Sequence, residues 1–222
     1  RCTRQLAELP GIGRSTAGAI ASLSMAAGSS IVRGGGSSSL DVTGAALLSN
    51  AVTTSGLQRY LGAVSLGANT TLTGSSINTH STLAGGDNAL TIAGTADIDG
   101  DYTGITNLSI TGAASIAANI TTSGTQTYSN AVSLLNNTTL IGSTVSTGST
   151  LTGLDGSTKR SLTVTGAATF GDGTGADSIT DLTTLSVSGN AALNLDAITT
   201  SGTPWAAKTA RWPTRPARPT AS

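Results

Sequence analysis

The sequence predicts a mainly β protein: a parallel β-helix, or β-solenoid, over residues 30–203, with a short α-helical hairpin before it and a disordered tail after it. A nine-residue phrase with apolar residues at its first, third, seventh and ninth places occurs five times. This alternation is typical of strands with one buried face. The chain is also poor in charged (10%) and aromatic (3%) residues and contains 29 glycines. Such a composition suits stacked coils of small residues better than a globular core or a disordered chain.

Residues 1–28 have the pattern of a helical hairpin. Leu6 and Leu9 lie three residues apart, so they share one face of a first helix, which a Pro-Gly pair then ends. A Ser-Thr pair follows and can begin a second helix, which we expect to run to about Met25. We treat this segment as a unit separate from the repeats.

One stretch of the hairpin, LPGIGRSTAGAIASLS (9–24), closely resembles the helix-hairpin-helix of A/G-specific adenine DNA glycosylases. The resemblance implies a fragment of a cytoplasmic base-excision repair enzyme that contacts DNA phosphates without reading sequence. In such a hairpin, backbone amides and the positive end of the second helix face the phosphate. The resemblance assigns this contact to Gly11, Ile12, Gly13 and Arg14.

The chain departs from that family after the hairpin. The resemblance implies a catalytic aspartate in a Pro-x-x-Asp-Gly-Asn-type segment and four cysteines for an iron–sulfur cluster, but Cys2 is the single cysteine and the segment is absent. Asp41 stands downstream, yet it occupies the variable second place of the repeated phrase, so we interpret it as a solvent-facing strand residue. We therefore expect no enzyme activity, no catalytic residue and no cofactor.

The repeat array occupies residues 30–203. Its phrase reads LDVTGAALL (40–48), LTIAGTADI (90–98), LSITGAASI (108–116), LTVTGAATF (162–170) and LSVSGNAAL (185–193). The spacing indicates a coil of about 20 residues, hence roughly eight or nine coils and a rod of about 40 Å at about 4.8 Å per stacked strand. A flat antiparallel sandwich is the alternative, and missing Asn-Gly hairpin signals weigh against it. The leucines expected to share one interior column are Leu40, Leu90, Leu108, Leu162 and Leu185.

A longer repeat contains the phrase. The stretch 63–83 is restated at 131–151 with a constant offset, and the offset grows where the turn-rich segments 153–161 and 171–178 lengthen the chain. Insertions of this kind are expected at the corners of a solenoid, where the strands can keep their register. The invariant glycine at the fifth place of the phrase predicts a bend or a close approach of another backbone.

Parts of the array carry a second resemblance. The stretches 121–140 and 162–193 resemble the filler repeats of large bacterial exoproteins of the filamentous-haemagglutinin and autotransporter-passenger kind. That resemblance implies a secreted or cell-surface stalk, structural or adhesive and without catalysis, of which this chain would be an internal slice. The partners it implies are a host surface or further copies of the chain.

The array offers weak signals for ligands. The stretch 173–179 matches half of a calcium-binding nonapeptide, and 96–101 gathers three carboxylates. Calcium requires about six to eight oxygens, which nonapeptide solenoids supply from successive copies. Because the nonapeptide pattern occurs only once in this sequence, we interpret both stretches as solvated corner turns and predict no metal site. His80 matches Gly148 in the next copy, which indicates a surface turn.

Global features exclude several partners. The formal net charge is zero, so nothing in it favours nucleic acid or an anionic membrane. No run of about 18 apolar residues is present, so no membrane span is predicted. The sequence likewise shows no phosphate loop and no nucleophile–base pair, and we expect no small-molecule substrate.

The tail at 204–222 contains four of the five prolines and both tryptophans. A Pro- and Arg-rich segment of this kind is usually disordered. The repeat stops in mid-phrase before the tail, so we expect a chimeric or fragmentary chain. A severed solenoid exposes strand edges, which predicts self-association.

Two functions of different classes follow. The preferred one is a non-enzymatic structural or adhesive solenoid segment, because the array covers most of the chain. The alternative is the DNA glycosylase fragment.

Overall fold

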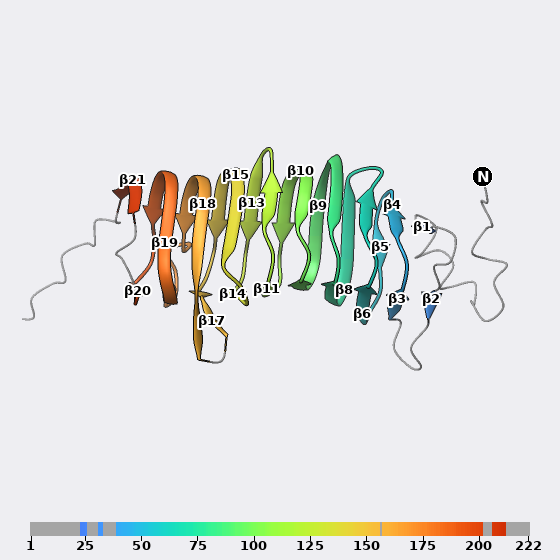
Figure 1. Cartoon of the computed structure of the whole chain (residues 1–222), viewed down its shortest axis with the longest axis horizontal. Helices are drawn as coiled ribbons and strands as arrows, with labels where there is room; N and C mark the ends of the chain where they lie inside the picture. Colours follow the sequence, from blue (N-terminus) through green and yellow to red (C-terminus); the bar gives the residue numbers. More distant parts are fainter. Residues whose placement is uncertain (1–22, 26–30, 33–38, 156, 202–205, 212–222) are drawn as a thin grey trace, which may run out of the picture.

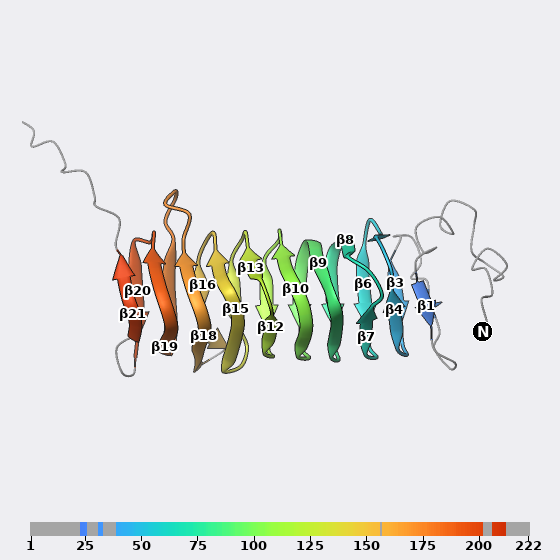
Figure 2. The same ribbon diagram turned by 90° about the horizontal axis from the view of Figure 1, so that it is seen from above.

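The computed structural model describes residues 23–25, 31–32, 39–155, 157–201 and 206–211. Over these residues the chain is mainly β, contains no helix, and forms a parallel β-solenoid of about 8 turns. The turns stack into a straight rod whose axis follows the chain from its blue end to its red end (Figure 1; Figure 2). The predicted fold class is confirmed for the array.

The rod is built from strands that alternate buried and outward-facing residues, as the sequence pattern indicated. Its strands are β1 (Leu23–Met25), β2 (Ile31–Val32), β3 (Leu40–Val42), β4 (Ala46–Leu48), β5 (Val52–Thr53), β6 (Leu57–Tyr60), β7 (Val64–Leu66), β8 (Thr70–Thr79), β9 (Leu83–Ile98), β10 (Tyr102–Ile110), β11 (Ala114–Ile116), β12 (Ile120–Thr122), β13 (Thr125–Tyr128), β14 (Val132–Leu134), β15 (Thr138–Thr147), β16 (Leu151–Thr152), β17 (Leu154–Asp155), β18 (Thr158–Phe170), β19 (Ser178–Leu193), β20 (Ala197–Thr200) and β21 (Ala206–Arg211).

Each turn of the solenoid has three sides, which we name faces A, B and C. In the first turn, β3 lies on face A, β4 on face B and β5 on face C; the chain then returns to face A, where Gln58 pairs with Leu40. The longer strands bend at the corners and continue from one face to the next. Ala96 pairs with Ala114 and Ala114 with Val132, so the length of a turn there is close to that of the predicted coil.

Strand pairing runs through the whole array and defines one interior column per face. On face A the column is Leu40, Gln58, Ile77, Ala96, Ala114, Val132, Leu151, Ile179 and Ile198. On face B it is Ala46, Val64, Leu83, Tyr102, Ile120, Leu140, Val164 and Val187. On face C it is Val52, Leu72, Ile92, Ile110, Tyr128, Thr147, Phe170 and Leu193.

The predicted single column of leucines is wrong, although all five leucines are buried in the common core. Leu90 stacks on Leu108 on face C, Leu162 stacks on Leu185 on face B, and Leu40 lies on face A. The nine-residue phrase is therefore a corner, made of two short rungs joined by a glycine, and the chain uses it at all three corners. This is possible because each side of the triangle presents the same alternation of buried and outward residues.

The glycines at the fifth place of the phrase mark close backbone approaches, as predicted. A Cβ added at Gly112 would overlap the backbone of Gly94, and one at Gly189 would overlap Gly166. Gly166 also has a φ of 133°, which residues with a side chain rarely adopt. Corner glycines thus allow consecutive turns to stack at the spacing of a β-sheet.

The two turn-rich insertions lie at corners, as expected. The first forms an antiparallel hairpin between β17 and the start of β18, and it projects from the side of the rod (Figure 1). The second forms a loop in which Gly171, Gly173 and Gly175 all have positive φ values. After the first insertion β18 pairs with β15, and after the second insertion β19 pairs with β18.

Both ends of the described chain differ from the predictions. The helix expected to reach Met25 is wrong for Leu23–Met25, which form β1 and pair antiparallel with β4. The open edge of the first turn offers backbone hydrogen bonds that replace those of a helix; β2 likewise pairs antiparallel with β3. The rest of the predicted hairpin lies outside the described residues.

The predicted disordered tail is wrong over Ala206–Arg211. These residues form β21, which pairs parallel with β19 and adds a further rung to the rod. The backbone edge of β19 can accept any extended segment, whatever the composition of that segment. Residues 212–222 lie outside the described part of the chain.

Candidate functional site

Polar side chains inside the core make a matched pair of clusters. Gln126 is fully buried; its Nε2 donates to the carbonyl oxygens of Ile120 at 3.1 Å and Ile141 at 2.8 Å. The hydroxyl of Tyr128 donates to Gln126 Oε1 at 2.9 Å. The amide thus ties a corner of its own turn to the next turn.

The same arrangement occurs in the preceding copy of the longer repeat. Gln58 Nε2 donates to the carbonyl oxygens of Val52 at 3.0 Å and Thr73 at 2.8 Å, and Tyr60 donates to Gln58 Oε1 at 2.9 Å. Sequence reasoning missed these clusters; the signal was the recurrence of Gln-x-Tyr at the offset of the longer repeat. Burial raises the pKa of the Tyr60 and Tyr128 phenols, so both remain neutral donors and serve the fold.

Face A carries a ladder of charged and polar side chains along its N-terminal turns. Asp41 faces outward, as predicted, and pairs with Arg59 of the next turn; this contact raises the pKa of the Arg59 guanidinium. Asn78 Nδ2 then donates to Asp97 Oδ2 at 3.3 Å. Burial and, secondly, the neighbouring Asp99 raise the pKa of Asp97.

His80 lies at the surface directly after β8, which agrees with the predicted surface turn. Its Nδ1 lies 2.6 Å from Asp99 Oδ2, one turn further along the rod. Both side chains are more than one-third exposed. The pair is another rung-to-rung contact on the outside of the solenoid, and ion pairs at such exposed positions contribute about 0–1 kcal/mol.

The carboxylates of the second insertion hold their own loop together. Asp172 Oδ1 accepts hydrogen bonds of 2.7 Å from both the backbone nitrogen and the hydroxyl of Thr174, which lower the pKa of Asp172. Asp177 Oδ2 accepts from the backbone nitrogen of Asp172 at 3.0 Å. Within the described segments, no group of three or more His, Cys, Asp or Glu residues could hold a metal ion.

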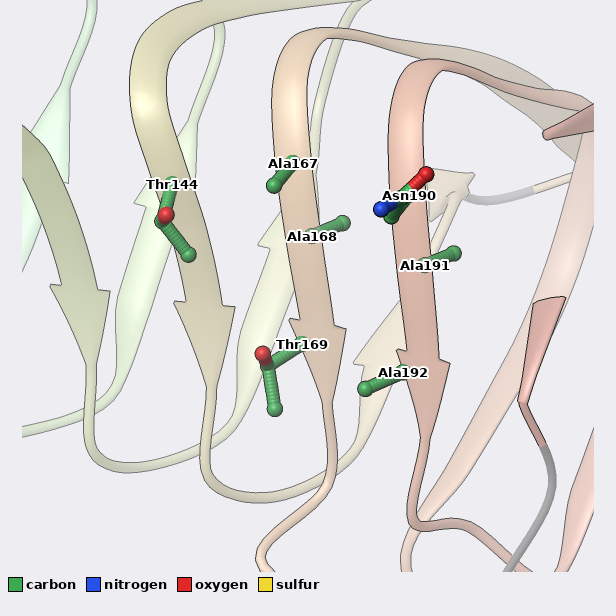
Figure 3. Close-up of a pocket in the computed structure, with 7 residues that line it drawn as sticks. All are labelled: Thr144, Ala167, Ala168, Thr169, Asn190, Ala191 and Ala192. Carbon is green, nitrogen blue, oxygen red and sulfur yellow. The ribbon is translucent and has the colours of Figure 1, made fainter. Parts of the chain in front are cut away.

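A shallow hollow of about 290 Å³ lies on the C-terminal turns of face C (Figure 3). Small side chains of three neighbouring turns line it: Thr144, Ala167, Ala168, Thr169, Asn190, Ala191 and Ala192. Methyl groups, hydroxyls and one amide offer no acid, base or nucleophile of altered reactivity. The hollow therefore presents only small apolar and uncharged polar side chains.

The DNA-contact residues suggested by the hairpin, Gly11, Ile12, Gly13 and Arg14, lie outside the described residues. The structure therefore brings none of them into a site. In the part of the chain that the structure describes, no helix is long and apolar enough to cross a membrane.

No family model matches this chain, and neither a curated protein nor a solved structure matches it.

Proposed function

We propose that the chain is a structural and adhesive segment of a secreted or cell-surface bacterial exoprotein, and that it is not an enzyme. The observation that carries this proposal is the continuity of the core. Every turn from Leu40 to Leu193 contributes buried residues to the same column on each face. A fold of this kind holds its outer faces at a fixed spacing over its whole length, which suits a stalk or a contact surface.

The outer faces support a role in contact. They carry mainly Thr, Ser and Asn between the buried positions, and such side chains both donate and accept hydrogen bonds. A long surface of this type binds through many weak contacts repeated along the rod, so its strength comes from their number. The export and the bacterial surface come from the resemblance of the repeats to exoprotein stalks.

An adherence assay tests the adhesive role. Beads coated with the chain are expected to bind epithelial cell layers at several times the level of albumin-coated beads. Beads coated with heat-denatured chain are the matched control, because they carry the same composition without the ordered faces. Equal binding by all three bead types would contradict adhesion.

Duplex DNA tests the other class of function. Binding to DNA through phosphate contacts falls steeply as salt rises. We expect no shift of a duplex probe at low salt. A salt-sensitive shift that disappears in a Gly11→Pro and Gly13→Pro double variant would instead support the glycosylase-like fragment.

A further inference from the structure

Face C carries an unbroken ladder of hydroxyl groups. The central outward position of successive turns is occupied by Thr or Ser, and each pairs in register with the next. The ladder consists of Thr71, Thr91, Ser109, Thr127, Ser146 and Thr169. The register follows from the buried neighbours on either side, which fix the strand so that these positions all point outward.

Face C is also free of charge in all three of its outward columns over these turns. Before the ladder stand Asn69, Ala89, Asn107, Thr125, Thr144, Ala167 and Asn190; after it stand Thr73, Ala93, Thr111, Ser129, Gly148, Gly171 and Asn194. The other faces differ in this respect. Face A presents Asp41, Arg59 and Asp97, and face B presents Asp101. The charges that keep two rods apart are therefore segregated away from face C.

We propose that face C is a self-association surface, and that its partner is face C of a second copy of this chain. A symmetric dimer needs a patch that is complementary to itself. Hydroxyl and amide groups meet this condition because each can both donate and accept a hydrogen bond, whereas a face bearing charges of one sign would repel its copy.

The size of face C sets the strength of the pairing. The six turns of the ladder and the following turn, which has Ala192 at the ladder position, make seven rungs. Seven rungs at about 4.8 Å and five residues at about 3.3 Å give roughly 550 Å² on each copy. Two copies bury about 1,100 Å², which is at the lower limit for a specific interface. The dimer is therefore weak and reversible, and several copies held close together on a surface would form it most readily.

The shape of face C favours a dimer in which the two rods run antiparallel. The hollow lies at the C-terminal end of the face, while exposed Asn69 and Asn107 stand towards its N-terminal end in the same outward column as Ala167. An antiparallel pair places the asparagine end of one rod over the hollow end of the other. This inference uses the rod described above and does not depend on its adhesive role.

Sedimentation velocity over a hundredfold range of concentration tests the proposal. The wild-type chain is expected to show a reversible monomer–dimer equilibrium. Thr91→Lys combined with Thr127→Lys places two charges on face C and should raise the dimer Kd at least tenfold. The matched control, Ser65→Lys combined with Thr103→Lys on face B, should behave as wild type. A wild-type monomer at every concentration, or equal effects of both double variants, would overturn the proposal.

Cross-linking provides a second readout that does not require charged variants to fold. In a Cys2→Ser background, Thr127→Cys is expected to form an intermolecular disulfide under mild oxidation, while Thr103→Cys on face B does not. Cross-linking of Thr103→Cys alone would reject face C. Failure of either experiment leaves the bead assay unaffected, so the two proposals can fail separately.

Discussion

The hydroxyl of Tyr128 donates a hydrogen bond of 2.9 Å to Oε1 of Gln126, and both side chains are fully buried. The amide nitrogen of Gln126 in turn satisfies two carbonyl oxygens at a corner of the rod. A buried polar group is tolerated only when its hydrogen bonds are made. The cluster therefore fixes the corner and has a structural role.

Replacing this amide should be costly. Gln126→Leu leaves the Ile120 and Ile141 carbonyl oxygens and the Tyr128 hydroxyl without the amide as their partner, and we expect a loss of about 2–3 kcal/mol in the free energy of unfolding. Urea denaturation measures it. Thr127→Ala, which changes the outward residue between them, is the control and should stay within about 0.5 kcal/mol of wild type. Equal stability of Gln126→Leu and wild type would contradict the structural role.

A second prediction separates crowding from backbone strain at the corners. Gly166→Ala combines a φ of 133° with overlap between the new Cβ and the backbone of Gly142, and we expect a loss of about 3 kcal/mol or more. Gly175→Ala keeps a positive φ of 80° but has nothing within 4 Å, and should lose only about 1–2 kcal/mol. Equal melting temperatures for the two variants would show that overlap between neighbouring turns adds nothing to the cost of the positive φ.

The strands of the array and the direction of their side chains could be predicted from the alternation of apolar and polar residues, but the shape of the turn could not. Leu90 and Leu162 occupy the same place in the phrase, yet they lie on faces C and B. The period of the longer repeat is not a whole number of turns, since Val64 lies on face B and its counterpart Val132 on face A. The length of the repeat in the sequence therefore differs from the length of a whole number of solenoid turns.

The ends of the described chain and the interior polar clusters were harder to foresee for other reasons. Leu23–Met25 had a helical pattern, but the edge of β4 supplied a partner that no local pattern reveals. Gln58 and Gln126 look like surface residues by type; only the turn-to-turn register puts them inside, beside carbonyl groups that need donors. Contacts between distant segments decided both outcomes.

Buried phenols make stability depend on alkaline pH. Burial raises the pKa of Tyr60, Tyr102 and Tyr128 in the folded state, while an unfolded tyrosine titrates near pH 10. The folded state therefore holds these protons when the unfolded state has lost them. Stability should be constant between about pH 8 and about pH 9 and fall as the pH rises above about 10.

Denaturation midpoints at pH 8, 9, 10 and 11 check this dependence. A Tyr128→Phe variant should be less stable than wild type at pH 8, because Gln126 loses a hydrogen-bond partner. Above pH 10 its denaturation midpoint should fall less steeply with pH than that of wild type, because one buried phenol has been removed. A midpoint that does not change from pH 8 to pH 11 would indicate that the phenols are accessible to water in the folded chain.

Asp97 should weaken the fold slightly at neutral pH. Its pKa is raised by burial and by Asp99, so the folded state prefers the protonated form and is destabilised when the carboxyl is ionised. This destabilisation disappears as the pH falls through the folded pKa. Asp97→Asn keeps an acceptor for Asn78 and should gain less than about 1 kcal/mol at pH 7, because the group is partly exposed.

The pH comparison is the control for that variant. The gain of Asp97→Asn over wild type should shrink towards zero at pH 3, where the carboxyl is protonated in both states. If Asp97→Asn is still more stable than wild type by the same amount at pH 3, the gain in stability comes from packing and not from removal of the charge. The stability difference between a Ser115→Asn variant, changed at the next position of the same outward column, and wild type should not depend on pH.

Disulfide formation between chosen turns tests most directly that each turn has three sides and stacks on the next in the observed register. In a Cys2→Ser background at low protein concentration, Thr91→Cys with Ser109→Cys places two Cα atoms about 4.8 Å apart in adjacent strands, within the range of a disulfide. We predict an intramolecular disulfide for this pair and none for Thr91→Cys with Thr163→Cys, although Thr163 holds the same place in the repeated phrase. Cross-linking of the second pair and not of the first would contradict the three-sided solenoid.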